Sequence, residues 1–340
     1  MDMPLGLVLL IIPLVSFILT YIAVPPLIRK LKNSGFVAHD MNKPGKPKVV
    51  KLGGVAVFLG VIVAFLLPLQ LAANSIATTA LLGAALSISL IAFLGFVDDV
   101  LNIPQLYRVI LPLFAALPLM LLKLGVSEIA LPFVGTVNLH FGYITLPIIG
   151  TIGLNLYVLV LIPIGVIACS NLVNLLAGFN GLEAGTGIII AIFMIIILIM
   201  TGFNQEKIVA IFLMISLLGA LSAFIMFNWY PAKVFPGNIV TYLIGVCVAV
   251  AVIIGNVEKA GAILMMPQIV EFFLKALSRF KAQNFGKCMG KRLYYEGEVR
   301  SITHIVMKLF RPTETQLVLI ICGLQVLAGI MAILSILVGL

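Results

Sequence analysis

Two adjacent carboxylates follow a long apolar run. In the segment GFVDDVLNIPQLYR (95–108), Asp98 and Asp99 are accompanied by an amide at Asn102 and a guanidinium at Arg108. A carboxylate at the centre of a bilayer costs about 2.5–3.5 kcal/mol on an insertion scale, so we expect the pair at the membrane edge or in a wet cavity. Capping of a helix end is the simpler alternative. The whole chain has only 12 acidic residues, however, so a tandem pair favours a functional site.

A second polar stretch is rich in asparagine and glycine. NLVNLLAGFNGLEAG (171–185) holds Asn171, Asn174 and Asn180 and three glycines directly after an apolar run. Asn171 and Asn174 are three residues apart and would share one face of a helix end. Asparagine both donates and accepts, which suits a nucleobase edge, a phosphate or a metal ion, and glycine lets the backbone approach a ligand. A helix boundary explains one or two glycines but not three asparagines, so this stretch indicates binding.

A third stretch, FNWYPAKVFPGN (227–238), contains the only Trp in the chain. An aromatic belt at the membrane interface and a Pro-rich turn account for Trp229 and Tyr230. They account less well for Asn238, which follows a glycine at the expected start of a helix, where backbone N–H groups favour anionic ligands.

A fourth stretch, HDMNKPGKPKVVKLGG (39–54), forms a basic loop after the first apolar run. Its cations have a plain role as a topology signal. Asp40, Asn42 and Lys43 are also dense enough to contact a phosphate or a sugar, and the paired glycines at its end permit close helix packing. Both interpretations stay open from these residues alone.

The composition indicates what class of protein positions these residues. The 340 residues are 62% hydrophobic and 10% charged, whereas a soluble globular domain is about 45–50% apolar. We therefore predict an all-α polytopic membrane protein that forms a single integral membrane domain over residues 1–340. About ten transmembrane helices are expected from the apolar runs of spanning length, which fall at about 4–24, 52–71, 75–96, 109–125, 152–170, 183–202, 208–227, 239–255, 258–276 and 316–338.

The basic residues predict the orientation. Of the 21 Lys and Arg residues, all except Lys123, Lys207 and Lys259 lie on one side of a ten-span topology. By the positive-inside rule that side is cytoplasmic, and both termini face out. The same cations explain the net charge of +9 through contact with anionic lipid, and their division among short loops argues against nucleic-acid binding. The predicted cytoplasmic loops are about 25–51, 97–108, 171–182, 228–238 and 277–315.

One outer loop differs from the rest. Residues 127–147 alternate apolar and polar side chains around Gly135 and Gly142. This pattern predicts a small β-hairpin on the outer face.

Together the four polar stretches resemble the polyprenyl-phosphate N-acetylhexosamine-1-phosphate transferase family, and most closely its eukaryotic and archaeal branch. DMNK, LGFVDDVLN, NLVNLLAGFNGLEAG and NWYPAKVFPGN occur in the order and spacing of that branch. The resemblance implies transfer of GlcNAc-1-phosphate from UDP-GlcNAc to dolichyl or another polyprenyl phosphate with Mg²⁺ as cofactor, giving dolichyl-diphosphate-GlcNAc and UMP. This is the first step of lipid-linked oligosaccharide synthesis for N-glycosylation. An archaeal cell membrane is the expected location, with the endoplasmic reticulum membrane as the alternative.

The resemblance also implies roles for individual residues. Asp98 and Asp99 would organise the site of metal and phosphate, and Arg108, where the branch usually has Lys, would hold a phosphate. Asn174 and Asn238 are the implied metal ligands. The implied nucleotide-sugar contacts are Asp40, Met41, Asn102, Asn171, Asn180 and Glu183.

Two departures from the family pattern stand out. Asn238 occupies the position of an aspartate that binds Mg²⁺ in the family, so the metal should bind more weakly here because one formal charge is missing. The sugar-binding histidine and arginine motif of the last cytoplasmic loop is not clear. Arg279 and Lys281 lie near its place.

Other interpretations remain open at this point. The chain could use another UDP-sugar donor, act as a ten-helix secondary transporter, or bind a nucleotide-sugar without turnover. A transporter places its polar groups near the bilayer midplane, whereas these clusters lie at cytoplasmic helix ends. The expected partners are UDP-GlcNAc, the polyprenyl phosphate and membrane lipid, but no nucleic acid, and a homodimer stays open as the assembly.

Overall fold

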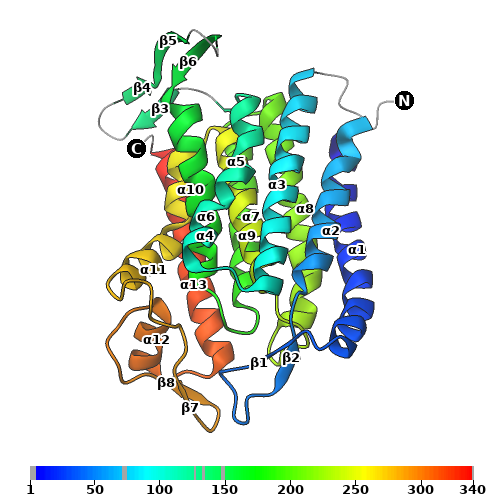
Figure 1. The fold of residues 1–340 in the computed structure, drawn as a ribbon, viewed down its shortest axis with the longest axis vertical. Coiled ribbons are helices and arrows are strands. Elements are labelled where there is room, and N and C mark those ends of the chain that lie inside the picture. Colours follow the sequence, from blue (N-terminus) through cyan, green and yellow to red (C-terminus); the bar gives the residue numbers. More distant parts are fainter. Residues whose placement is uncertain (1–4, 71–74, 126–127, 132–134, 147–149, 339–340) are drawn as a thin grey trace.

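A bundle of long, roughly parallel and antiparallel helices forms the body of the protein (Figure 1). The computed structural model describes residues 5–70, 75–125, 128–131, 135–146 and 150–338. Among these residues, 7 helical segments are long and apolar enough to cross a membrane. They are α1 (Leu5–Asn33), α3 (Ser75–Leu101), the π-helical turn η2 (Tyr157–Leu161) continued by α6 (Ile162–Leu175), α7 (Leu182–Met200), α8 (Gln205–Asn228), α9 (Gly237–Gly255) and α13 (Glu314–Leu337). The prediction of a helical, polytopic membrane protein is confirmed.

The other apolar runs form shorter helices. α2 (Gly54–Leu66) continues into the 3₁₀ turn η1 (Leu67–Gln70), and α4 (Gln105–Ile110) is followed by α5 (Pro112–Leu121). The expected ninth span is not one helix, because α10 (Glu258–Leu264) and α11 (Met266–Ala276) are separated at Met265. Pro267 near the start of α11 lacks a backbone N–H, and the Gln325 amide donates to the Leu264 carbonyl at 2.7 Å. The break is thus stabilised by a side chain from α13.

Helices extend beyond the apolar runs on the side with the basic loops. α1 continues to Asn33, α3 to Leu101 and α6 to Leu175, so the connections are shorter than the predicted loops at 25–51, 97–108 and 171–182. Lys, Arg and Leu are good helix formers, and backbone hydrogen bonding does not stop where the side chains become polar. Hydropathy therefore located the spans but not their ends.

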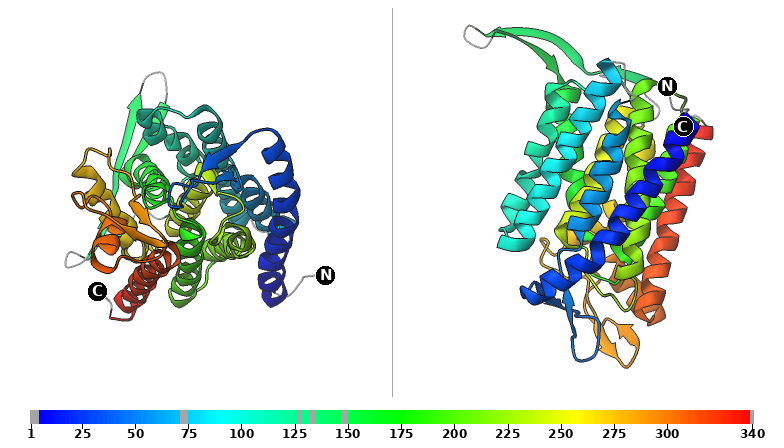
Figure 2. Two further views of the ribbon diagram at one scale, coloured as in Figure 1. Left: turned by 90° about the horizontal axis from the view of Figure 1, so that it is seen from below. Right: turned by 90° about the vertical axis from the view of Figure 1, so that its right-hand side faces the viewer.

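Small strands cover both ends of the bundle. The predicted outer hairpin at 127–147 is two hairpins in the part that the structure describes, β3 (Glu128–Leu131) with β4 (Gly135–Asn138) and β5 (His140–Leu146) with β6 (Gly150–Asn155). They project from one end, at which α1 also begins and α13 ends (Figure 2). The opposite end carries the basic loops, with β1 (Val37–His39), β2 (Lys48–Val50), β7 (Lys287–Met289), β8 (Arg292–Tyr294) and α12 (Ile302–Phe310).

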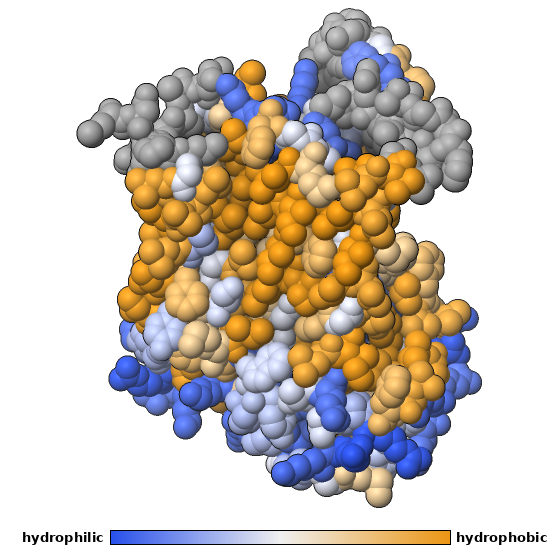
Figure 3. Space-filling model, turned by 180° about the vertical axis from the view of Figure 1, so that it is seen from behind, coloured by the Kyte–Doolittle hydropathy of each residue, from blue (hydrophilic) through white to orange (hydrophobic). Residues whose placement is uncertain are grey.

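The surface agrees with a membrane location. On the face shown in Figure 3, apolar side chains cover the middle of the bundle, and hydrophilic side chains gather at the end that holds β1, β2 and α12. Lys123, Lys207 and Lys259, the three exceptions to the basic side, lie at the ends of α5, α8 and α10 that face the other way. The protein is therefore a multi-pass membrane protein with an asymmetric charge distribution.

α9 is the central helix, and small residues let its neighbours approach closely. A Cβ built on Gly95 of α3 would lie 2.8 Å from the Cα of Ile239, so α3 and α9 touch through their backbones at this point. Gly53 and Gly54 pack in the same way against residues 234–239, as expected from the sequence. Close approach of this kind is typical of helix interfaces in membranes. It brings the end of α3 directly to the start of α9.

Candidate active site

The acidic pair at the end of α3 meets the first turn of α9. The Asp99 carboxylate accepts the backbone N–H groups of Asn238 at 2.9 Å and of Ile239 at 3.3 Å. These N–H groups have no partner within their own helix, and a carboxylate is favourable at a helix N-terminus. Gly237 has a left-handed backbone with φ +72°, and a Cβ there would collide with the Asp99 side chain. The glycine in PGN thus leaves room for the acid.

Asp98 is buried, with 1% of its surface exposed, and its carboxylate is saturated with donors. Arg108 Nε lies 2.9 Å away, Asn238 Nδ2 donates at 2.8 Å and the Tyr242 hydroxyl at 3.1 Å. The backbone N–H of Ile103 adds a fourth bond at 3.1 Å. A buried carboxylate is tolerated only with such compensation. Asp98 therefore joins α3, α4 and α9 and holds the Arg108 guanidinium in place.

The end of α6 is tied to the same place. The Thr241 hydroxyl lies 3.2 Å from Asn174 Oδ1 and 3.1 Å from the Asn238 carbonyl oxygen. Asn171, one turn earlier, donates to the Ile167 carbonyl of its own helix at 2.9 Å. Asn174 and Asn238 thus come together although they are 64 positions apart in the chain.

The loop between α6 and α7 is organised by hydrogen bonds to its backbone. Gly178 has φ +112°, and its N–H donates to Glu183 Oε1 at 2.8 Å. The N–H of Gly181 donates to Asn228 at 3.1 Å, and a Cβ on this glycine would meet the Trp229 ring at 2.5 Å. Trp229 is therefore packed against the loop, which is a more specific place than the interfacial belt suggested by the sequence.

A buried ion cluster closes the far side of this loop. Lys43 contacts the Asp40 carboxylate, lies 2.9 Å from Asn180 Oδ1 and 3.4 Å from Glu314 Oε2, and stands 4.7 Å from the centre of the Tyr230 ring. The Asn180 N–H donates to Glu314 Oε1 at 2.8 Å. The first loop, the 178–183 loop and the start of α13 are thus joined. The Lys43 ammonium thus holds this loop, and the phosphate or sugar contact that the sequence suggested for it stays a prediction.

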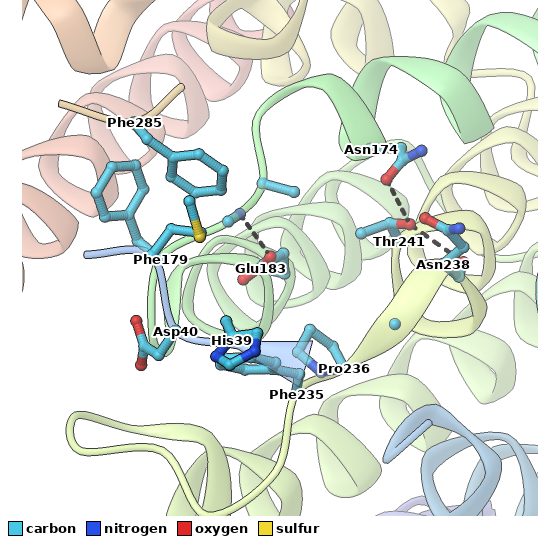
Figure 4. Close-up of a pocket in the computed structure, with 14 residues that line it drawn as sticks. His39, Asp40, Asn174, Phe179, Glu183, Phe235, Pro236, Asn238, Thr241 and Phe285 are labelled. Carbon is cyan, nitrogen blue, oxygen red and sulfur yellow. Dashed lines mark hydrogen bonds between the residues drawn. The ribbon is translucent and has the colours of Figure 1, made fainter. Parts of the chain in front are cut away.

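A pocket of about 290 Å³ with a mixed lining opens between these groups (Figure 4), and we call it the polar pocket after its carboxylate, amide, hydroxyl and imidazole side chains. Asn174, Thr241 and Asn238 lie at one side of it, and Phe179, Phe285, His39 and Asp40 at the other, with Glu183 between them. Asp40 and Glu183 are buried, while Met41 at the rim is 41% exposed. The pocket therefore has an amide-rich side and a side with aromatic and acidic residues.

A larger apolar cavity of about 840 Å³ lies next to the pocket. Its walls come from α4, α6 and α11, and its polar lining includes Arg108, Asn171 and Asn174. Phe272 and Phe273 of α11 are exposed beside it. Asn174 lines both cavities, so the polar pocket and the apolar cavity meet at this side chain.

The structure brings most of the predicted residues together. Asp98, Asp99, Arg108, Asn174 and Asn238 form one connected group, and Asp40, Met41, Asn180 and Glu183 form a second group around the 178–183 loop. Asn180 lies behind the pocket, with its side chain bonded to Asp40 and to the Ala232 N–H. Asn102 is exposed at the end of α3 with φ +50°, and its side chain is not among those that line either cavity.

Sequence reasoning missed several residues of the site. Tyr242 and Thr241 lie one turn into α9, and Lys51 donates to the Asp99 carbonyl at 3.0 Å. Glu314 resembles an ordinary acidic residue at a helix start. Its only signal was that it is one of few acids next to an apolar run, and Phe285 gave no signal at all.

The oxygen-bearing side chains at the pocket can be compared with the ligands that the expected Mg²⁺ would need. The described residues contain no group of three or more His, Cys, Asp or Glu side chains placed to hold a metal. Mg²⁺, however, commonly takes one or two protein oxygens and completes its shell with water and substrate phosphates. The amides of Asn174 and Asn238, on one side of the pocket, fit an ion that enters with a diphosphate. They do not fit a pre-formed site made of carboxylates.

Comparison with known proteins adds a family and relatives. The model of a family described as glycosyl transferase family 4 matches residues 81–256. A protein of Saccharolobus solfataricus named "Putative UDP-N-acetylglucosamine--dolichyl-phosphate N-acetylglucosaminephosphotransferase" is 39% identical over 324 residues, which is 94% of each chain. A protein of the same name from Sulfolobus acidocaldarius is 36% identical over 333 residues, covering 97% of this chain and 96% of its own.

A eukaryotic relative extends the similarity. The UDP-N-acetylglucosamine--dolichyl-phosphate N-acetylglucosaminephosphotransferase of Dictyostelium discoideum is 29% identical over 290 residues, which is 75% of this chain and 68% of the relative. The matched segment 81–256 contains the acidic pair, the 171–185 stretch and the start of α9. The similarity thus includes the part of the chain that builds the connected group around Asp98.

Proposed function

The chain belongs to glycosyl transferase family 4, and we propose that it transfers N-acetylglucosamine 1-phosphate from UDP-GlcNAc to dolichyl or another polyprenyl phosphate. The products are a polyprenyl-diphosphate-GlcNAc and UMP. The similarity to relatives that are named for this reaction, over at least 94% of both chains for two of them, supports the choice of substrates. In this assignment the reaction is the first step of lipid-linked oligosaccharide synthesis for N-glycosylation.

One observation carries the proposal, namely that a polar pocket and an apolar cavity meet at Asn174. A nucleotide-sugar is polar throughout, whereas a polyprenyl phosphate is an apolar chain with a charged head. Carboxylate, amide and hydroxyl side chains lie among apolar ones in the smaller cavity, whereas the larger cavity is walled mainly by apolar side chains and has Arg108 in its lining. Two such substrates can therefore place their phosphates at the same point from different sides.

The chemistry requires positioning more than covalent catalysis. A phosphate oxygen of the acceptor attacks the β-phosphorus of the donor, a new P–O bond forms, and the bond from the β-phosphorus to the bridging oxygen breaks to release UMP. A phosphate monoester is largely ionised near pH 7, so it needs no general base. Asp98 and Asp99 are fully engaged by Arg108, Asn238 and the α9 backbone. We therefore assign them an organising role.

Cations must reduce the repulsion between the two anionic substrates. Arg108 is the cation closest to Asp98 and lines the apolar cavity, so we assign it to the acceptor phosphate. A bound Mg²⁺ would supply further charge neutralisation at the diphosphate. Asn174 and Asn238 are the residues that would hold it. Asp98, which also accepts the Tyr242 hydroxyl, fixes the Asn238 side-chain amide, and Asp99 accepts the backbone N–H of the same residue.

The proposed site faces the cytoplasm. Its support is the concentration of Lys and Arg at the site end of the bundle, in agreement with the positive-inside rule. The similarity to two archaeal relatives favours an archaeal cell membrane over the endoplasmic reticulum. The family match supports a transferase and gives no support to the transporter interpretation. The polar side chains that line the two cavities come from the end of α6, from α4, from the first loop and from the starts of α7 and α9, and not from the middle of the long helices.

The proposal is tested with purified protein, dolichyl phosphate and Mg²⁺. Radiolabelled UDP-GlcNAc, UDP-GalNAc and UDP-MurNAc-pentapeptide are supplied in parallel, and label is followed into the lipid phase. We expect labelled lipid with UDP-GlcNAc alone. Label in the lipid from another donor would correct the assigned substrate, and retention of nucleotide without labelled lipid would show a binding protein in place of an enzyme.

A further inference from the structure

A side chain from the last basic loop holds the end of α6. Asn284 lies between α11 and α12 and is 7% exposed. Its Nδ2 group donates to the carbonyl of Leu175 at 2.8 Å and to that of Ala177 at 2.7 Å. The last backbone carbonyls of a helix receive no N–H from within the helix, so they need a donor from elsewhere. A primary amide is one of the few groups that can donate to two carbonyls at once.

The segment that Asn284 holds separates two parts of the active site. Asn174 immediately precedes Leu175, and Ala177 and Gly178 line the polar pocket. The turn has no regular helical hydrogen bonding after Leu175, since Leu176 has φ −95° and ψ +58°. The two bonds from Asn284 fix the Leu175 and Ala177 carbonyls of this turn, while Gly178 is held by Glu183 and Asn42. Asn284 therefore helps to set where the turn lies and, with it, where the Asn174 amide points.

The backbone at Asn284 and at the residue after it is also held. The backbone carbonyl of Asn284 accepts the Thr303 hydroxyl at 2.7 Å. The next residue, Phe285, packs edge-on against Phe179 with ring centres 6.1 Å apart, and it covers Gly178, where a Cβ would meet the ring at 2.8 Å. The loop thus supplies a hydrogen-bonding residue and a pocket wall from two successive positions.

The support continues to the helix that lines the apolar cavity. Thr303 is the second residue of α12, and its hydroxyl lies 2.8 Å from that of Ser301, the residue that caps the helix. The Ser301 hydroxyl lies 3.1 Å from Glu271 Oε2, and the Ile302 N–H donates to the same oxygen at 2.8 Å. Glu271 is fully buried on α11, while Phe272 of the same helix lines the apolar cavity. A continuous set of hydrogen bonds therefore runs from α11 through α12 to the end of α6.

We propose that Asn284 is a positioning residue for the proposed sugar-phosphate transfer, setting Asn174 and the 177–178 wall of the pocket through its two bonds to the α6 carbonyls. It touches neither substrate. The kinetic test of this inference rests on the proposed function, but the effect of Asn284 on the shape of the polar pocket does not.

The test compares Asn284→Asp with a matched change elsewhere. Asp has the same shape but no hydrogens to donate, and its charge would face two carbonyl oxygens. Asn204→Asp is the control, because Asn204 caps α8 at the opposite end by accepting the Lys207 N–H, a task that Asp performs equally well. For each protein, kcat, the KM for UDP-GlcNAc and the half-saturating Mg²⁺ concentration are measured. The rise in Tm on adding UDP with Mg²⁺ is measured as well.

We expect Asn284→Asp to lower kcat/KM for UDP-GlcNAc by about tenfold or more, because small displacements of a positioning group are costly. KM and the Mg²⁺ requirement should rise, and the UDP-induced rise in Tm should shrink. A purely structural role would reduce the active fraction and therefore kcat, with KM and the Mg²⁺ requirement unchanged. That result, or wild-type values throughout, overturns the inference.

Thr303→Val keeps the inference testable if Asn284→Asp does not fold. It removes only the hydroxyl that holds the Asn284 backbone, so we expect the same changes at about threefold. Unchanged KM, Mg²⁺ requirement and UDP response in this variant would also overturn the proposal. If the wild-type protein transfers no sugar phosphate, the proposed function fails, whereas the UDP-induced Tm still decides whether Asn284 sets the pocket.

Discussion

Asn238 donates a hydrogen bond of 2.8 Å to Asp98 across 140 positions of the chain. The amide is the only donor group of that side chain, and it points at a carboxylate that already receives Arg108 and Tyr242. The family pattern leads us to expect an aspartate at position 238. In this protein an asparagine stands there and donates to the neighbouring carboxylate of Asp98. The first prediction follows from this contact.

Asn238→Asp should make the protein bind Mg²⁺ more tightly and make it less stable when Mg²⁺ is removed. Without the ion, two carboxylates would face each other where an amide now bridges, so we expect a lower Tm in EDTA. With the ion, the added charge should lower the Mg²⁺ concentration that gives half-maximal activity. Tm and activity over a Mg²⁺ titration check both parts. A requirement for Mg²⁺ that is unchanged or higher would contradict the prediction.

Arg108→Ala should affect the lipid acceptor more than the nucleotide donor. Arg108 lines the apolar cavity and pairs with Asp98, so its loss removes the cation assigned to the acceptor phosphate. We expect the KM for polyprenyl phosphate to rise about tenfold or more, as for loss of a hydrogen bond to a charged group, with UDP binding nearly unchanged. Arg292→Ala, an exposed arginine on β8, is the control. An equal loss of UDP binding in Arg108→Ala would disprove this assignment.

Lys43→Met should destabilise the protein. It would leave Asp40 and Glu314, both almost fully buried, without their cation. Removing one partner from a buried ion pair costs about 3–5 kcal/mol, so we expect a clear fall in Tm. Lys46→Met, an exposed lysine of the same loop, should leave Tm nearly unchanged. Similar Tm values for the two variants would argue against a stabilising role of the cluster.

Ala168→Phe should obstruct the apolar cavity. Ala168 lines it on α6, and a phenyl ring there would occupy space assigned to the polyprenyl chain. We expect a higher KM for long-chain acceptors and an unchanged Tm response to UDP. Ala262→Phe, at an exposed position of α10, introduces the same ring outside the cavity and should act like wild type. If both variants retain the wild-type acceptor KM, the lipid lies elsewhere.

Acid should weaken the support of the last basic loop. Burial lowers the pKa of His304 to about 4, with Lys275 and Lys308 adding to the shift. Its ring accepts the Arg300 N–H at Nδ1 and contacts the Gln283 carbonyl through Nε2, so the neutral form is bound. The unfolded chain binds the proton near pH 6.5 and the folded protein only near pH 4. Stability should therefore fall as the pH decreases between these values. His304→Gln should show a flatter dependence of Tm on pH, and an identical dependence would contradict the assignment to this residue.

The sequence predicted the parts of the site that depend on local composition. Asp98 and Asp99 were found because acids are rare in an apolar chain, and Asn174 and Asn238 because amides cluster at helix ends. Hydropathy located the apolar runs, and seven of them form helices of spanning length in the described part of the chain. The runs at 52–71 and 109–125 form shorter helices, and the run at 258–276 is broken at Met265, where Gln325 from another helix donates to the Leu264 carbonyl. Local patterns do not record such long-range partners.

For the same reason, the residues that support the site could not be predicted from the sequence. Asn284 and Glu314 contact the 175–180 segment over more than 100 positions of the chain. Nothing in their own neighbourhood distinguishes Asn284 from any polar loop residue or Glu314 from an ordinary helix cap. The outer loop was predicted as one hairpin because alternation reveals strands but not which strands pair.

The position of Asn174 on the wall between the two cavities also has a kinetic meaning. Apart from Asn174 the two cavities have different lining residues, so one reactant does not have to leave before the other arrives. An enzyme built in this way works through a ternary complex. Double-reciprocal plots at several fixed acceptor concentrations would then intersect, whereas the parallel lines of a ping-pong scheme would require the sugar phosphate to rest on the protein itself between two half-reactions.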